Sequence, residues 1–439
     1  MVEPRTRGNG VRLVLTGDVI HTRRLAPTVT TDPAFAAVVE RLRAADATFG
    51  NLEITIAERD DPDAWVWSVP EDWAIAGEPH AIEDLRELGF DLVGRANNHA
   101  MDRGPAGMRA TGRSLDAAGI VHAGAGEDLA RARVPRFLET ANGRVGLVSA
   151  TTSPVPVDVA PSLDAFAGLP ARPGVHAIGV RATVTVPSAA HEALRALHQL
   201  MSDAAGEWLV GQDGLRMFRS TFVEGAEVAV SYEPVPEHAA AAMRAVRQAR
   251  QQADVAIFAI HAHEGDRDPQ RPMAHLRGLA RDAITAGADV VVVSGPHVLA
   301  PIEIHAGRPI FYGLGNFLWS DVGGPLSLDF WERTREALGD GAPDPAVATE
   351  AELLTLLNDD GFGDPWVFRA VLAEVVSGPT LAVQLHPVDL GFGLPVTSSG
   401  IPRAADADVG TEILERVAAI SEPYGTTIER VDGVGVLRI

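Results

Sequence analysis

Short apolar segments alternate with amphipathic segments of helical length along most of the chain. The apolar runs are VRLVLT, FDLV, VGLVSA, DVAIFAI, DVVVV and PIFY, and each is followed at once by glycine or a polar residue. Between them, stretches such as PAFAAVVERLRAAD and HLRGLARDAITAG carry apolar residues at helical spacing. This alternation predicts an α/β fold in which helices cover a parallel or mixed sheet. Ligands of such sheets bind at the carboxyl ends of the strands.

Two stretches depart from this rhythm, namely residues 154–250 and the acidic, irregular segment that follows GLGNFLW. Residues 154–250 begin rich in proline and continue with two strongly amphipathic segments, so we expect a helical insertion there. The chain then divides into four parts. Residues 1–153 and 251–325 are expected to form two parts of one core, and residues 326–439 a C-terminal extension that completes it.

Composition excludes several classes of function. A formal net charge of −22 argues against nucleic acid or an anionic membrane as partner. The chain has no cysteine and no lysine, which removes disulfides, thiolate chemistry and Schiff-base chemistry. The polar Asp18 comes before any apolar region of signal-peptide length, and no stretch approaches the roughly 18 apolar residues of a membrane span. We therefore expect a cytoplasmic protein.

Five predicted strand ends carry imidazole, carboxylate or amide groups. They are Asp18 and His21 in GDVIH, Asn51 and Glu53 in GNLE, Asn98, His99 and Asp102 in NNHAMD, His261 and His263 in HAHE, and His297 in GPH. Any one of these loops alone would be a polar turn or a helix cap. Together at one sheet edge, imidazole and carboxylate groups suit a divalent cation of intermediate hardness. The pattern therefore favours a metal centre.

The segments around these residues resemble the CapA family of capsule-biosynthesis-type proteins, a branch of the calcineurin-like metallophosphoesterases. The similarity covers most of residues 11–320, and its most specific blocks are NNHAMDRG and PHVL followed by GLGNF. The resemblance implies a calcineurin-like four-layer α/β/β/α sandwich with mixed sheets, to which this chain adds the helical insertion. It also implies metal ligands on the loops at one edge.

Position by position, the resemblance implies that the ion is held by Asp18, Glu53, Asn98 and His261. Gly295 stands where relatives carry the first histidine of the last His-x-His motif, so a ligand of a second ion is missing. We therefore expect one ion or an altered pair. The ion itself stays open among manganese, calcium, magnesium, iron and zinc.

The resemblance also implies catalytic roles. His99 and His297 are expected to act as a facing acid/base pair. Asp102 is expected to orient His99 through a hydrogen bond, although it can also cap the following helix. Asp18 is the expected partner of His297.

Four further residues are expected to bind substrate. They are His21, His263, Arg267 and Trp67. The histidines occupy positions where relatives commonly lack one, and an exposed loop histidine needs no function. Arg267 would bind a substrate carboxylate. Trp67, in DAWVWSVPEDW, would form an aromatic wall, with core packing as the alternative.

Three functions remain open. The first is a metal-dependent epimerase that acts on a peptide, because the resemblance includes members in lasso-peptide biosynthesis and histidine–aspartate pairs are plentiful here. The second is a metal-dependent hydrolase of a phosphoester or an isopeptide bond. The third is an accessory protein of poly-γ-glutamate or capsule biosynthesis. The change at Gly295 and the absence of lysine weaken phosphate chemistry, so we place the epimerase first.

Overall fold

The structure is a computed structural model. It describes residues 10–22, 24–58, 61–64, 74–154, 172–205, 215–217, 220–265, 271–319, 364–378, 381–394 and 398–439. Trp67 and Arg267, which were predicted to bind substrate, lie outside these residues.

A ten-stranded mixed sheet forms one half of the molecule, with β1 at its centre. β1 pairs in parallel with β2 and β19 and antiparallel with β20. The strands are β1 (Arg12–Ile20), β2 (Ala47–Leu52), β5 (Leu92–Gly94), β6 (Val121–Ala123), β19 (Asn316–Trp319), β20 (Arg369–Val376), β21 (Ala382–Asp389), β22 (Arg403–Ala404), β23 (Ile428–Val431) and β24 (Val434–Leu437). The last five come from the C-terminal part of the chain.

A six-stranded sheet packs against the first. Its order is β17-β18-β16-β15-β9-β8. The four inner strands β18, β16, β15 and β9 run parallel to one another, and the edge strands β17 and β8 are antiparallel to them. The strands are β8 (Arg136–Thr140), β9 (Gly143–Thr151), β15 (Val255–His261), β16 (Val290–Ser294), β17 (Ile302–His305) and β18 (Arg308–Phe311).

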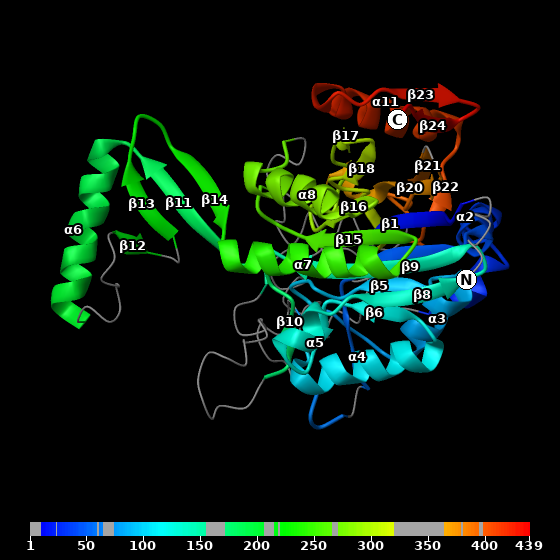
Figure 1. Cartoon of the computed structure of the whole chain (residues 1–439), viewed down its shortest axis with the longest axis horizontal. Helices are drawn as coiled ribbons and strands as arrows, with labels where there is room; N and C mark the ends of the chain where they lie inside the picture. The colour runs from blue at the N-terminus through cyan, green and yellow to red at the C-terminus, as the bar shows by residue number, and fades with distance from the viewer. Residues whose placement is uncertain are drawn as a thin grey trace, which may run out of the picture.

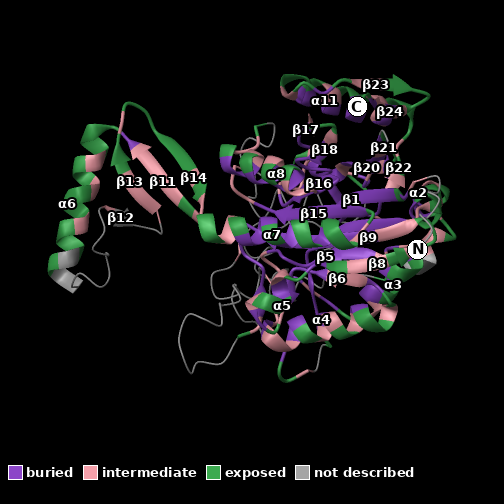
Figure 2. Cartoon of the chain, in the orientation of Figure 1, coloured by how far each residue is buried: buried purple, intermediate pink, exposed green. Residues whose placement is uncertain are grey.

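Alternation along the strands builds the core on both faces of each sheet. Leu13 of β1 and Ile257 of β15 belong to one buried cluster between the sheets. Their neighbours Val14 and Phe258 point the other way, into clusters beneath the covering helices. Figure 2 shows this buried interior within the main body.

Helices cover the outer face of each sheet. On the larger sheet lie α2 (Pro33–Ala44), α3 (His80–Leu88) and α4 (Gly104–Ala118), and on the smaller lie α7 (Pro236–Gln252) and α8 (Ala274–Ala286). The expected four-layer α/β/β/α sandwich is therefore confirmed. α11 (Ala407–Ser421) packs into the core between the sheets. Short elements complete the set: α1 (Ala26–Val29), α5 (Leu129–Arg133), β3 (Thr55–Ile56), β4 (Ala76–Gly77), β7 (Ala125–Gly126), β10 (Gly174–Val175), η5 (Pro365–Phe368) and η6 (Glu422–Tyr424).

The insertion carries an arm that projects from the body, at the left of Figure 1. It holds α6 (Ser188–Ala205) and a four-stranded sheet of β11 (Val180–Val186), β12 (Arg216–Met217), β13 (Ser220–Glu224) and β14 (Ala229–Pro234). The sequence indicates the two long helices, and it did not indicate the sheet. The second of these helices, α7, belongs to the covering layer of the core and not to the arm.

Candidate metal centre

The chain brings its polar strand ends together where the carboxyl ends of both sheets meet. The larger sheet supplies Asp18 near the end of β1, Glu53 directly after β2 and Asn98 after β5. The smaller sheet supplies His261 as the last residue of β15, and the loop after β16 carries His297. The expectation that these loops share one sheet edge is therefore met by the strand order.

Four side chains form a tight group of donor atoms. His261 Nε2 lies 2.7 Å from Asn98 Oδ1, 3.0 Å from His263 Nε2 and 3.5 Å from Glu53 Oε1. The side chains of His261 and Glu53 are 1% and 0% exposed. Two imidazole nitrogens and a carboxylate so close together in a buried place are the donors that a divalent cation prefers. The residues present therefore fit a metal ion.

The protonation state of His261 agrees with this fit. Burial holds the pKa of His261 well below its ordinary value, and the nearby rings of His263 and His297 lower it further. The neutral imidazole is the form that binds a metal. Ser294 Oγ lies 3.0 Å and Asn51 Nδ2 3.2 Å from His261 Nδ1, so these two side chains fix the ring and leave Nε2 facing the donor group.

Asp18 stands at the edge of the group. Its Oδ1 accepts a hydrogen bond from Asn51 Nδ2 at 2.9 Å, and its Oδ2 accepts one from the backbone nitrogen of Gly295 at 3.1 Å. The same Oδ2 lies 3.5 Å from His297 Nδ1. Asp18, Glu53 and His261 also offer ligand atoms within 4.8 Å of one another. Asp18 is thus placed both beside the ion site and beside His297.

His99 and Asp102 form a hydrogen-bonded pair within the NNHAMD loop. His99 Nδ1 lies 2.7 Å from Asp102 Oδ2, and the backbone nitrogen of Ile75 donates to the same oxygen at 2.7 Å. Asn97 Oδ1 accepts from the backbone nitrogen of His99 at 3.1 Å. Of the two roles considered for Asp102, the structure contains the hydrogen bond to His99, whereas the N-cap of α4 is Arg103.

His297 is fixed by an asparagine from another strand. Its Nδ1 lies 2.9 Å from Asn316 Oδ1, and Asn316 Nδ2 donates to the backbone oxygen of Val367 at 3.1 Å. The amide orientation makes Asn316 Oδ1 the acceptor, so His297 Nδ1 donates and Nε2 carries the lone pair. That Nε2 lies 3.9 Å from Glu53 Oε1. Asn316 belongs to the GLGNF block, and the parallel pairing of β19 with β1 places it opposite Asp18.

The structure places His21 and His263, which were both predicted to bind substrate, in different surroundings. His21 is fully buried and lies 3.2 Å from Asp84 Oδ2 of α3, which favours a structural role. His263 lies within the donor group, with its side chain 27% exposed. Ser294 contacts His261, and Asn97 accepts a hydrogen bond from the backbone of His99. The sequence did not predict these contacts, because nothing in the local sequence distinguishes the two residues from turn residues.

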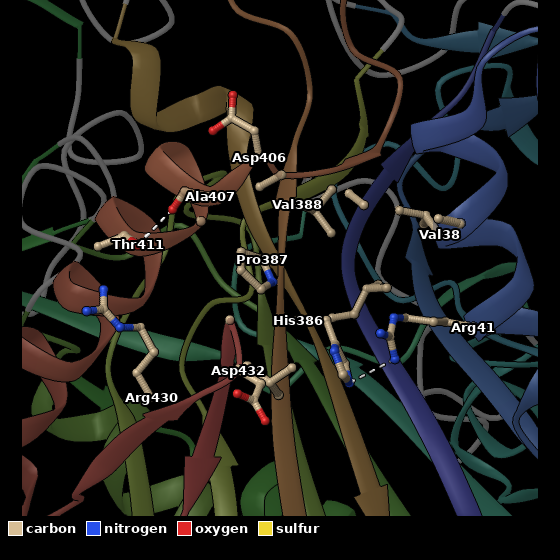
Figure 3. A pocket seen from close by; sticks show the side chains of 17 residues that line it. Val38, Arg41, His386, Pro387, Val388, Asp406, Ala407, Thr411, Arg430 and Asp432 are labelled. Atoms are coloured by element: carbon tan, nitrogen blue, oxygen red, sulfur yellow. Dashed lines mark hydrogen bonds between the residues drawn. The ribbon is translucent and has the colours of Figure 1, made fainter.

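A separate cavity of about 430 Å³ opens between α2, β21 and α11 (Figure 3). Arg41 and His386 lie on one side of it, with Arg41 Nη1 3.4 Å from His386 Nε2. Arg430 and Asp432 lie toward β23 and β24. None of the donors of the candidate metal centre lines this cavity.

The fold and the site define a calcineurin-like α/β protein with a donor set suited to a divalent metal. Comparison with known families makes this specific. The chain belongs to the bacterial capsule synthesis protein family PGA_cap, whose family model matches residues 12–321. The recognised likeness to CapA-type proteins is thereby confirmed.

Several curated proteins are similar to this chain. The uncharacterized proteins y4sH and y4uA of Sinorhizobium fredii are each 36% identical over 98% of this chain and 94% of their own length. The capsule biosynthesis protein CapA of Bacillus anthracis is 22% identical over 74% of this chain and 62% of its own. A solved structure of a hypothetical protein from Thermus thermophilus aligns over 90% of this chain and 96% of its own, at 13% identity and a TM-score of 0.32.

Within the part of the chain that the structure describes, every helix is too short or too polar to cross a bilayer.

Proposed function

We propose that the protein is a metal-dependent enzyme that epimerises a peptide residue at Cα, as in the maturation of a lasso-type peptide. One observation carries the proposal. Two histidines on different loops beside the donor group, His99 and His297, are each oriented through Nδ1 by a buried acceptor. Their side chains remain 15% and 12% exposed, so both can reach a ligand.

The residues around the ion would have distinct roles. Glu53, Asn98 and His261 would hold the ion, with Asp18 beside them. When bound, the ion would polarise the substrate carbonyl next to Cα and make the Cα proton more acidic.

The two histidines would move the proton. His297 Nε2, whose lone pair is set by Asn316, would accept the Cα proton on one face. His99 as imidazolium, stabilised by Asp102, would return a proton to the opposite face. One C–H bond breaks and one forms, so no oxidant or reductant is needed. The peptide substrate fits this chemistry because epimerisation needs an activated Cα between a carbonyl and an amide.

A metal-dependent hydrolase of an isopeptide or phosphoester bond is the second candidate. Glu53, His263 and His297 also offer ligand atoms within 4.8 Å of one another, which is a donor set for a second ion. In that case His297 would be a ligand, and His99 would protonate the leaving group. The similarity to capsule biosynthesis proteins favours a poly-γ-glutamate amide as the substrate of such a reaction.

The test is proton exchange at Cα. The metal-replete protein is incubated in deuterated water with a pool of candidate peptides, and products are analysed by mass spectrometry. We expect a one-dalton gain without cleavage for the wild type. His99→Ala and His297→Ala should each lose the exchange while circular dichroism shows an intact fold. His122→Ala, a histidine outside the site, serves as the matched control.

Two outcomes would reject the epimerase. Full exchange in either active-site variant would remove the acid/base roles. Cleavage of a peptide or release of phosphate without exchange would return the protein to the hydrolases.

A further inference from the structure

We propose that His263 is a ligand of the metal ion and completes a four-donor site with Glu53, Asn98 and His261. This role replaces the substrate contact that its sequence position indicates. The inference rests on the metal centre of the proposed function.

The separations within the group carry the inference. His263 Nε2 lies 3.0 Å from His261 Nε2, 3.4 Å from Asn98 Oδ1 and 3.9 Å from Glu53 Oε1. Ligand atoms at about 2.1 Å from one ion are separated by about 3.0 Å at right angles and about 3.4 Å at tetrahedral angles. The separations of His263 Nε2 from His261 and Asn98 match those of neighbouring ligands in one coordination shell. The separation from Glu53 is wider, but it is below the roughly 4.2 Å between opposite ligands of one ion.

The loop that carries His263 is held from several sides. The backbone nitrogen of His263 donates to Ser153 Oγ at 2.7 Å. The adjacent Glu264 accepts a hydrogen bond from Thr152 Oγ1 at 2.7 Å and lies 3.7 Å from the buried His275 Nε2. The ring of His263 lies edge-on to that of His261, with centroids 4.8 Å apart. Such support is what a metal ligand requires, because its geometry must be set before the ion arrives.

The facing loop explains why the donor comes from position 263. Gly295 has a φ of 113°, and a Cβ at this position would meet the backbone oxygen of Ala262 at 2.4 Å. No side chain fits there, so position 295 cannot supply a ligand. Ala262 directly precedes His263. The contact that excludes a side chain at 295 therefore lies directly beside the residue that carries the histidine.

The experiment compares metal binding by the full-length chain and two variants. Each protein is stripped of metal, titrated with Mn²⁺ by calorimetry, and assayed for bound metal by mass spectrometry. We expect His263→Ala to bind Mn²⁺ at least 10-fold more weakly than the wild type. His305→Ala, a partly exposed histidine of β17, is the matched control and should bind as the wild type does. Circular dichroism checks that the variants are folded.

Each result has a separate meaning. Weaker binding by His263→Ala alone supports the inference. Equal affinity in all three proteins overturns it, and equal affinity with a raised KM in His263→Ala would show that His263 contacts the substrate instead. A folded wild type that binds no metal would overturn the metal centre itself, and with it the proposed function.

Discussion

Single residues decide the protonation of the proposed catalytic groups, and Asp102 is the sharpest case. Its Oδ2 accepts hydrogen bonds from both His99 Nδ1 and the backbone nitrogen of Ile75. In Asp102→Asn the amide can present its NH₂ group to the imidazole, which favours the wrong tautomer and removes the charge that stabilises the imidazolium. We expect the Cα exchange rate to fall about 100-fold with little change in metal affinity.

The chain contains a control for this change. Asp116 pairs with His122 at 3.3 Å outside the site, and its side chain is 79% exposed. Asp116→Asn should leave the exchange rate unchanged. A normal rate in Asp102→Asn would mean that His99 is not the acid.

The sequence predicted where the candidate site residues lie better than which residues they contact. Asp18, Glu53, Asn98 and His261 follow apolar strands, so their common location was predictable from the strand pattern. His21 and His263 had the same local signal, yet only His263 joins the donor group. The difference comes from Asp84, which lies 63 positions from His21 in the sequence and reaches it through the packing of α3. Partners of this kind are set by tertiary structure.

At the scale of elements, the alternation of apolar and amphipathic segments predicted a helix-covered sheet, the family resemblance predicted a sandwich of two, and neither predicted the strands of the arm. β13 and β14 are partly exposed on both faces, so their apolar and polar residues carry little pattern. The neighbouring α6 has a clear helical period, which dominated the prediction for this region. Strands that are exposed to solvent on both faces and pair with distant segments lack the apolar/polar alternation that identifies a strand in the sequence.

A buried histidine fastens the segment after the proline-rich stretch to β9, and it makes stability depend on pH. His176 is fully buried, and its Nδ1 lies 2.9 Å from the backbone oxygen of Ser149. Burial, with a smaller contribution from Arg133, lowers the pKa of His176 to about 3. Between this value and the unfolded value of about 6.5, only the unfolded chain binds the proton.

This group should therefore destabilise the fold as pH falls. We expect a loss of up to about 1.4 kcal/mol per pH unit below pH 6 from this residue. Urea unfolding at pH 7, 6 and 5 measures it. His176→Gln cannot titrate, so its unfolding free energy should depend less on pH, whereas the arm variant His191→Gln should keep the wild-type slope. If the unfolding free energy depends equally on pH in all three proteins, the pH dependence comes from other groups.

At the scale of the whole molecule, the candidate metal centre lies between the two halves of the sandwich. Glu53 and Asn98 come from the larger sheet, and His261 and His263 from the smaller one. An ion that binds only the folded chain adds about 2.7 kcal/mol of stability at a concentration 100 times its Kd. Exhaustive chelation should lower Tm and remove activity, and added Mn²⁺ should restore both. Calorimetry measures the change in Tm. Full activity in the chelated protein would contradict the metal role.

The arm leaves and re-enters the body at one point, where the backbone nitrogen of Val235 donates to the oxygen of Gly179 at 2.7 Å. β11 and β14 pair from this point outward, beginning with Val180 opposite Pro234. The arm of more than fifty residues therefore interrupts the core no more than a hairpin turn would, because its two ends lie side by side. In engineering terms it is a cassette, so a short turn could replace it, or a foreign domain could be grafted there, without rerouting any strand of the sandwich.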